Sequence, residues 1–254
     1  MSAFKDHFSS HAAGYAAFRP HYPDGLAAWI ASIAPASGKA LDCGCGSGQL
    51  AMLLAEHFTE VIATDPSPQQ IARAAPHQRI SYRVAPAEAS GLARGSIDVL
   101  TAAQAAHWFD LPAFFAEARR VLAPGGALVL VSYAAMEADG AITAIVERFR
   151  LDTLQDYWPP ERAMVEEGYR GIHLPFQPLD APRFAIEVEW PLDALIGYLD
   201  TWSAVRAMER RIGREPFERV AAELGKAWGD PAICRRIRWP LAIRAGRHGG
   251  RGNA

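Results

Sequence analysis

Short apolar runs alternate with amphipathic helical patterns along the first half of the chain. In the helix that Pro23-Asp24 opens, apolar residues recur at i, i+3, i+4 and i+7, and Asp110 can cap a second helix over 111–122. The apolar runs predict five buried strands, which include residues 40–41, 60–64, 80–84, 96–103 and 127–132. Strands that alternate with helices indicate a parallel, doubly wound α/β sheet.

The pattern changes after residue 133. Helical stretches at 141–156 and 192–212 flank a segment rich in Trp, Tyr and Pro, which predicts a helical insertion over the site. Two further apolar stretches, 184–190 and 237–243, read as strands that would complete a seven-stranded sheet, and Pro240 favours an edge or a strand end.

A glycine-rich turn follows the first strand. The segment Leu41-Asp42-Cys43-Gly44-Cys45-Gly46-Ser47-Gly48-Gln49 predicts a strand, a nucleoside-binding turn and a helix. Its G-x-G-x-G spacing differs from the G-x-G-x-x-G of dinucleotide sites. Asp42 and Asp65 each end a predicted strand, which suits a ligand with ammonium and hydroxyl groups. The alternatives are an ordinary tight turn at 44–48 and a turn-forming role for Asp65 before Pro66.

Composition and net charge limit the classes of molecule that we expect the protein to bind. The 254 residues, 50% hydrophobic, suffice for one α/β domain with a smaller appendage, and a net charge of -2 makes nucleic acid a poor partner. We expect a small-molecule partner and a soluble, cytoplasmic protein without a membrane span, because the sequence has neither a leader pattern nor a long apolar stretch. Three cysteines favour neither disulfides nor a metal site, so Cys43 and Cys45 are interpreted as small residues beside a cofactor. The oligomeric state is not predicted.

Five landmarks in order resemble class I S-adenosylmethionine-dependent methyltransferases. They are the glycine turn, Asp65, Ala87-Glu88, Asp98-Val99-Leu100 and Leu122-Ala123-Pro124-Gly125-Gly126. Three further segments are similar to the methyltransferase type 11 branch that includes trans-aconitate-type methyltransferases: Asp6-His7-Phe8-Ser9, the stretch 15–23 and Gln104-Ala105-Ala106-His107-Trp108-Phe109. The resemblance implies a Rossmann-like methyltransferase fold, the cofactor S-adenosyl-L-methionine and the product S-adenosyl-L-homocysteine.

The residue pattern and the resemblance together predict an arrangement of domains. The expected parts are an N-terminal lid and first helix, 1–38; a cofactor-binding core, 39–133; a helical substrate-binding cap, 134–182 and 191–230; the last two core strands, 183–190 and 231–245; and a disordered tail, 246–254.

Roles for cofactor-site residues follow from the same resemblance. The glycine turn would pack against the methionine part of the cofactor with Asp42 near its ammonium, while Asp65 would accept from both ribose hydroxyls. Glu88 either lies along the adenine edge or belongs to the solvated surface. Gln104 either borders the sulfonium or satisfies loop backbone. Tyr15 and Arg19 belong to a lid over the cofactor, or else Tyr15 packs in an aromatic cluster on an ordinary helix and Arg19 is exposed before Pro20. The expected cofactor-binding residues are Tyr15, Arg19, Asp42, Gly44, Cys45, Gly46, Gly48, Asp65, Pro66, Ala87, Glu88, Gln104 and Ala105.

The acceptor site is predicted around the end of the fourth strand. His107 is either a catalytic base or a hydrogen-bonded wall residue, and Trp108 either faces the sulfonium or packs. Arg206 and Arg210, one helical turn apart, are candidates for a carboxylate clamp, against the alternative of solvated helix faces. The expected substrate-binding residues are His107, Trp108, Tyr157, Trp158, Trp202, Arg206 and Arg210.

These observations favour methyl transfer to a small-molecule acceptor, with an oxygen of a carboxylate or hydroxyl as the preferred atom. Gln104-Ala105-Ala106-His107 stands where an Asn/Asp-Pro-Pro-aromatic motif would indicate amino methylation. Two alternatives remain open at this point: an NAD-dependent oxidoreductase, and a non-catalytic cofactor-binding protein of methyltransferase fold.

Overall fold

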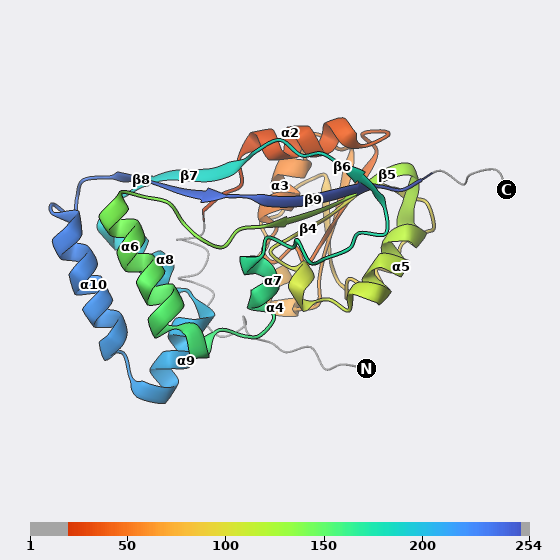
Figure 1. Ribbon diagram of the computed structural model, residues 1–254. Coiled ribbons are helices and arrows are strands. Elements are labelled where there is room, and N and C mark those ends of the chain that lie inside the picture. Colours follow the sequence, from red (N-terminus) through yellow and green to blue (C-terminus); the bar gives the residue numbers. More distant parts are fainter. Residues whose placement is uncertain (1–19, 250–254) are drawn as a thin grey trace.

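A seven-stranded sheet forms the larger lobe of the computed structural model, which describes residues 20–249 (Figure 1). Its strand order is β3-β2-β1-β4-β5-β9-β6. The strands are β1 (Lys39–Cys43), β2 (Glu60–Asp65), β3 (Ile80–Val84), β4 (Ile97–Ala103), β5 (Leu122–Ser132), β6 (Gln177–Leu179) and β9 (Ala242–Arg247). The first five are parallel, and β9 runs antiparallel between β5 and β6. The predicted doubly wound, mostly parallel sheet is confirmed.

The helices of this lobe connect the strands. They are α2 (Asp24–Ile33), α3 (Gln49–Leu54), α4 (Pro68–Ile71), the 3-10 turn η1 (Ala106–Trp108), α5 (Leu111–Val121) and α7 (Arg162–Glu166). Asp110 caps α5 as predicted, because its side chain accepts a hydrogen bond from the backbone N–H of Ala113.

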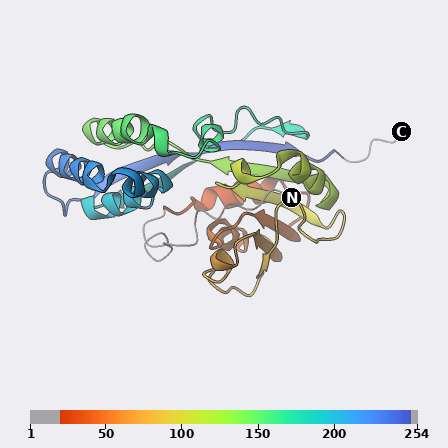
Figure 2. The ribbon, with the colours of Figure 1, turned by 90° about the horizontal axis from the view of Figure 1, so that it is seen from below.

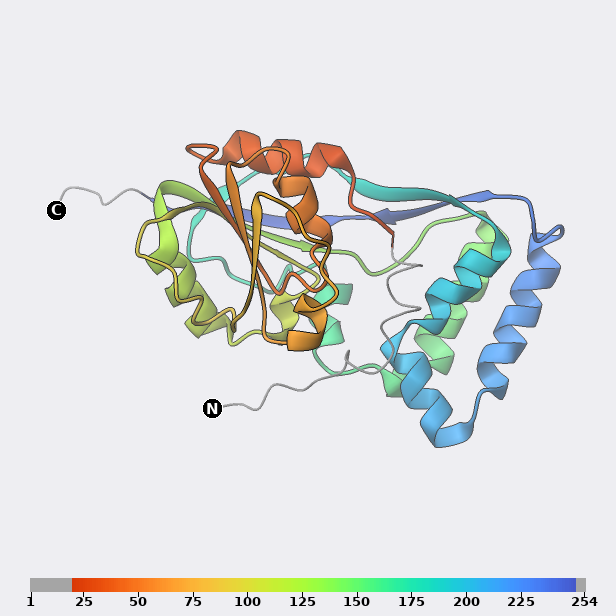
Figure 3. The ribbon, with the colours of Figure 1, turned by 180° about the vertical axis from the view of Figure 1, so that it is seen from behind.

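Both faces of the central strands are buried. Ala40 and Val99 face one apolar cluster with α2 and α3, whereas the adjacent residues Leu41 and Leu100 face a second cluster with α5. Figure 3 shows α2 and α3 from their side of the sheet. Burial on both faces explains why these strands are continuous apolar runs rather than alternating ones.

A second lobe extends from one end of the sheet (Figures 1 and 2). It contains α6 (Gly140–Arg148), η2 (Phe149–Thr153), η3 (Gln155–Tyr157), β7 (Ala185–Trp190), α8 (Leu192–Asp200), α9 (Ser203–Ile212), α10 (Glu215–Trp228) and β8 (Arg235–Pro240). β7 and β8 form a separate antiparallel ribbon. The predicted helical insertion over 141–156 and 192–212 is therefore present.

The prediction that residues 183–190 and 231–245 form the last two strands of the core sheet is wrong in part. Residues 183–190 do not join the core sheet, and of 231–245 only the part in β9 does so; the short β6 provides the other strand. Buried Ile186 lies between more exposed neighbours in β7, a pattern that fits a ribbon covered on one side. Pro240 has no N–H to continue a ladder, and the chain passes there from β8 into β9.

Two predicted boundaries also change. Gly246 and Arg247, assigned to a disordered tail over 246–254, pair with Leu128 and Ala127 in the sheet. β6 lies within 134–182, which was assigned wholly to the cap. Of the predicted N-terminal part, 1–38, residues 1–19 lie outside the described residues. Over residues 20–249, no helix is both long enough and apolar enough to span a membrane.

Candidate active site

The glycine turn lies at the carboxyl end of β1, where the strand order reverses. β2 and β4 flank β1 on its two sides, so a crevice is expected beyond the ends of these strands. Gly44, Gly46 and Gly48 have φ values of 65°, 56° and 88°, in the left-handed region that favours glycine. α3 begins at Gln49, immediately after the turn. The predicted sequence of strand, turn and helix is thus observed.

Close packing within the protein explains why two of these positions have no room for a side chain. A Cβ on Gly44 would lie 2.5 Å from the Cβ of Ala105, and one on Gly48 would lie 2.4 Å from the hydroxyl oxygen of Tyr82. At Gly46 the nearest such atom, on Gln70, would be 4.0 Å away. The turn is therefore open at Gly46, where a ligand can approach the backbone.

Asp65 fastens the turn to β2. Its Oδ2 accepts a hydrogen bond from the backbone N–H of Gly46 at 3.0 Å, and its Oδ1 accepts one from the N–H of Ser67 at 2.8 Å. A carboxylate oxygen can accept more than one hydrogen bond, so these two bonds do not by themselves exclude the predicted contact with ribose hydroxyls. Asp65 consequently has a structural role that was not predicted, beside the expected one.

Asp42 is a buried carboxyl group at the end of β1. Its Oδ1 accepts a hydrogen bond from the hydroxyl of Thr101 at 2.8 Å. Burial raises the pKa of Asp42 to about 7, an effect that the Thr101 bond opposes and the negative charge of Asp65 reinforces. A cationic group nearby would favour the ionised form. The open backbone at Gly46 and the carboxylates of Asp42 and Asp65 therefore fit the ammonium and diol of the expected cofactor.

Residues after β3 and β4 complete the crevice. Ala87 is buried, and Glu88 accepts a hydrogen bond from the N–H of Asp110 at 2.9 Å, so its carboxylate supports the start of α5. Gln104 has a φ of 53° and donates through Nε2 to the carbonyl of Tyr133 at 2.7 Å. This bond agrees with the interpretation that Gln104 satisfies loop backbone.

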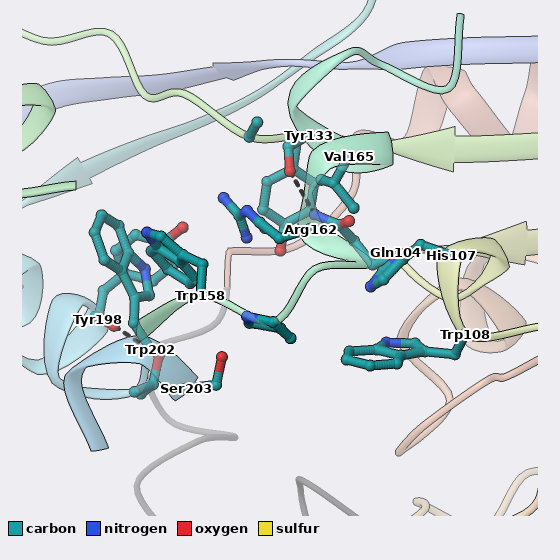
Figure 4. Close-up of a pocket in the computed structure, with 13 residues that line it drawn as sticks. Gln104, His107, Trp108, Tyr133, Trp158, Arg162, Val165, Tyr198, Trp202 and Ser203 are labelled. Atoms are coloured by element: carbon teal, nitrogen blue, oxygen red, sulfur yellow. Dashed lines mark hydrogen bonds between the residues drawn. The ribbon is translucent and has the colours of Figure 1, made fainter. Parts of the chain in front are cut away.

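A pocket of about 110 Å³ opens between the two lobes (Figure 4). Gln104 lines it, so the pocket adjoins the end of β4 and the cofactor crevice. Four predicted substrate residues also line it: His107, Trp108, Trp158 and Trp202. Its volume suits a small molecule or one end of a longer one.

Arg162 is the one arginine or lysine among the described lining residues, and Asp and Glu are absent from that lining. Its guanidinium lies 4.5 Å from the centre of the Trp158 ring, and its Nε donates to Glu166 at 2.8 Å. The indole of Trp158 is itself held by a 3.0 Å hydrogen bond to the carbonyl of Arg150. Within residues 20–249 the terminal amino groups of Arg162 make no hydrogen bond. The pocket therefore offers a fixed, planar cation beside an aromatic wall.

His107 is buried and points into the pocket from η1 (Figure 4). Its Nδ1 lies 2.9 Å from the hydroxyl of Tyr169. Burial, and then the positive charge of Arg162, lower the pKa of His107 to about 3. The imidazole is therefore neutral at physiological pH, and of the two predicted roles the structure favours a hydrogen-bonded wall residue.

The predicted clamp on α9 is not found in this pocket. Arg206 forms ion pairs with Asp200 and Glu209 at 2.7 and 2.9 Å, and Arg210 is exposed. Tyr157 also lies outside the lining and packs near Arg211. Intramolecular pairing and exposure thus agree with the alternative of solvated helix faces.

Arg162 and Tyr169 are the residues that sequence reasoning missed. Arg162 was one of many arginines in the insertion, and no motif distinguished it. Tyr169 follows Gly168, a helix-ending signal that could have located the end of α7 but not its contact with His107. Tyr15 and Arg19, the expected lid residues, lie outside the described residues. Within the described part, no three His, Cys, Asp or Glu side chains are grouped to hold a metal ion.

Comparisons with known proteins agree with this geometry. A family model described as a methyltransferase domain matches residues 41–130. A Dictyostelium discoideum protein provisionally named a methyltransferase is 34% identical, over 89% of this chain and 87% of the relative. A solved structure from Anaeromyxobacter dehalogenans, titled as a provisional type II methyltransferase, is 51% identical with a TM-score of 0.87, over 92% of this chain and 99% of that one. A malonyl-[acyl-carrier protein] O-methyltransferase of Enterobacter lignolyticus is 29% identical over 67% of this chain and 63% of its own length.

Proposed function

The chain belongs to the class I S-adenosylmethionine-dependent methyltransferases, and we propose that it methylates a carboxylate oxygen of a small organic acid. The cofactor supplies a methyl group on a sulfonium, which is already an activated electrophile. The protein then has to orient the acceptor in line with the transferring bond and to exclude water. The glycine turn alone left open an NAD-dependent oxidoreductase, and membership of the methyltransferase family argues against that alternative.

In the proposed site the crevice residues hold the cofactor. The backbone around Gly46 would approach its methionine part, Asp42 its ammonium and Asp65 its ribose hydroxyls. The buried backbone at Ala87 would meet the adenine. Gln104 would border the transferring methyl, because it lines the acceptor pocket and also follows β4.

The observation that carries the acceptor proposal is the guanidinium of Arg162 in the pocket, whose Nε is paired with Glu166 while its terminal amino groups are left for a ligand. Arg162 presents its terminal amino groups to a cavity whose described lining contains no acidic side chain. A guanidinium binds a carboxylate through two parallel hydrogen bonds and thereby fixes its orientation. A protonated amine would instead be repelled by Arg162.

The chemistry of the neighbouring histidine supports the same acceptor class. A carboxylate is ionised at neutral pH and needs no base before methyl transfer, whereas a hydroxyl or an ammonium must lose a proton. The pKa of His107 near 3 makes it a weak base for that task. The O-methyltransferase name of one relative further supports oxygen as the acceptor atom.

The test is transfer of a radiolabelled methyl group from S-adenosylmethionine to a panel of small carboxylic acids, each paired with its alcohol and its amine. We expect a base-labile methyl ester from one or more acids. Arg162→Gln should raise KM for that acid by about tenfold or more, as expected for loss of a hydrogen bond to a charged group. The matched control Arg210→Gln, on an exposed arginine, should leave KM unchanged. Transfer only to amines or alcohols, or equal effects of the two variants, would contradict the proposal.

A further inference from the structure

Tyr169 is held against His107 by the way α7 ends. Gly168 has a φ of 59°. The N–H of Tyr169 donates to the carbonyl of Met164 at 2.9 Å, and the N–H of Gly168 donates to the carbonyl of Val165 at 2.9 Å. This pair of bonds is the Schellman motif of helix termini. The helix that carries Arg162 into the pocket therefore also fixes the position of Tyr169.

The backbone at Tyr169 is strained in a way that points to function. Among the described residues, only Gln104 and Tyr169 have positive φ without being glycine, with values of 53° and 58°. A left-handed conformation is costly for an aromatic residue and persists only where the surroundings impose it. Both residues belong to the site: Gln104 lines the pocket, and the hydroxyl of Tyr169 meets Nδ1 of His107.

The hydroxyl of Tyr169 is oriented as a donor to the imidazole. Its side chain is fully buried, and burial raises the pKa of Tyr169, so the phenol keeps its proton. Within residues 20–249, Nδ1 of His107 is the one hydrogen-bond partner of this buried phenol, so the phenol proton donates to Nδ1. Nδ1 is then an acceptor, and the proton of the neutral ring resides on Nε2.

We propose that His107 is a neutral hydrogen-bond donor that binds the acceptor carboxylate through Nε2–H beside Arg162, and that Tyr169 is the positioning residue that fixes this tautomer. The inference rests on the proposed function and adds a specificity determinant to it. Within residues 20–249 the ring makes no second hydrogen bond, so Nε2 is the nitrogen left for a ligand in the pocket. A neutral donor together with a guanidinium suits a carboxylate and provides no base for a hydroxyl.

Two amide variants of His107 separate this role from the alternatives. A glutamine amide reaches the position of Nε2 and keeps a donor in the pocket, whereas an asparagine amide reaches only the position of Nδ1 and keeps the contact with Tyr169. We expect H107Q to form the methyl ester with KM within about threefold of the unaltered protein, and H107N to raise KM by about tenfold with little change in kcat. A purely structural role predicts the reverse order, since only H107N preserves the Tyr169 contact.

Tyr169→Phe tests the positioning role. Removing the phenol releases the imidazole tautomer, so KM should rise severalfold, while in the H107Q background the same change should leave KM unaltered because an amide has no tautomer to fix. Affinity for S-adenosylhomocysteine serves as the folding control. With S-adenosylmethionine at saturation, whose ammonium would keep Asp42 ionised, the ratio kcat/KM of the unaltered protein for the acid should be flat from about pH 6 to 8, because neither the acid nor His107 titrates there.

The outcomes are distinguishable. Absence of a base-labile ester with the unaltered protein overturns the proposed function and this inference together. Ester formation with equal KM for H107N and H107Q, or a Tyr169→Phe effect that persists in the H107Q background, overturns the inference alone. A third outcome is a kcat/KM that rises with pH, with a pKa between about 6 and 7, in the unaltered protein but not in either His107 variant. This result would make His107 a base and would also overturn the inference.

Discussion

Replacing Asp42 by asparagine tests the electrostatics of the cofactor crevice. Burial raises the pKa of this carboxyl from 3.8 to about 7, so the folded protein binds a proton that the unfolded chain has released between these values. The free energy of unfolding should therefore fall as pH rises through this interval, and the full penalty should be present above about pH 7. At about 1.36 kcal/mol per pH unit, the shift corresponds to a penalty on the order of 4 kcal/mol.

Asparagine preserves the shape and the acceptor for Thr101 but cannot ionise. We expect the difference in unfolding free energy between Asp42→Asn and the unaltered protein to grow by up to about 4 kcal/mol from about pH 4 to pH 8, in favour of the variant. Urea unfolding of the cofactor-free protein, followed by tryptophan fluorescence, measures this difference. Asp156→Asn, at an exposed carboxyl, is the matched control. A difference that stays constant with pH would refute the reasoning.

The remaining predictions concern packing and charge away from the pocket. Gly48→Ala should lower the free energy of unfolding by about 1–3 kcal/mol, because φ is 88° and the new Cβ would overlap the hydroxyl oxygen of Tyr82. Gly140→Ala, where a Cβ would meet open space, is the control. A urea midpoint of Gly48→Ala that equals those of the control and the unaltered protein would contradict this prediction. Arg206→Ala should lower stability by less than about 1 kcal/mol and leave KM for the acid unchanged, because its ion pairs are partly exposed; a raised KM would return it to the site. The Arg120 hydrogen bond lowers the pKa of buried Glu117 to about 2, so the stability it contributes should be lost as pH falls from 4.5 towards 2; Glu117→Gln should remove that dependence, and parallel acid-unfolding curves would argue against it.

The sequence was sufficient to predict the part of the fold in which local patterns decide the structure. The strands β1 to β4 and the helices α2, α3 and α5 lie where apolar runs, helical periodicity and caps predicted them. These signals are contained within short stretches of chain. The same holds for the left-handed turn at Gly44, Gly46 and Gly48.

Features that depend on long-range pairing were not predictable in this way. The pairing of β7 with β8 rather than with the core follows from where the second lobe folds, and β6 is a three-residue edge strand with Pro178 at its centre. Only tertiary structure shows that Arg162 lines the pocket and that Arg206 does not, since both are arginines of the insertion. The second role of Asp65, as acceptor from backbone N–H groups, likewise has no signal in the sequence.

The division of the site into a cofactor crevice and an acceptor pocket is tested most directly by calorimetric titration with S-adenosylhomocysteine, with NAD titrated in parallel. We expect saturable binding of S-adenosylhomocysteine and none of NAD, with affinity reduced by Asp65→Ala and unchanged by Arg162→Gln. Because Asp65 also fastens the glycine turn, the thermal midpoint of Asp65→Ala is measured alongside. Absence of S-adenosylhomocysteine binding, or a loss of affinity in Arg162→Gln equal to that in a folded Asp65→Ala, would contradict the account.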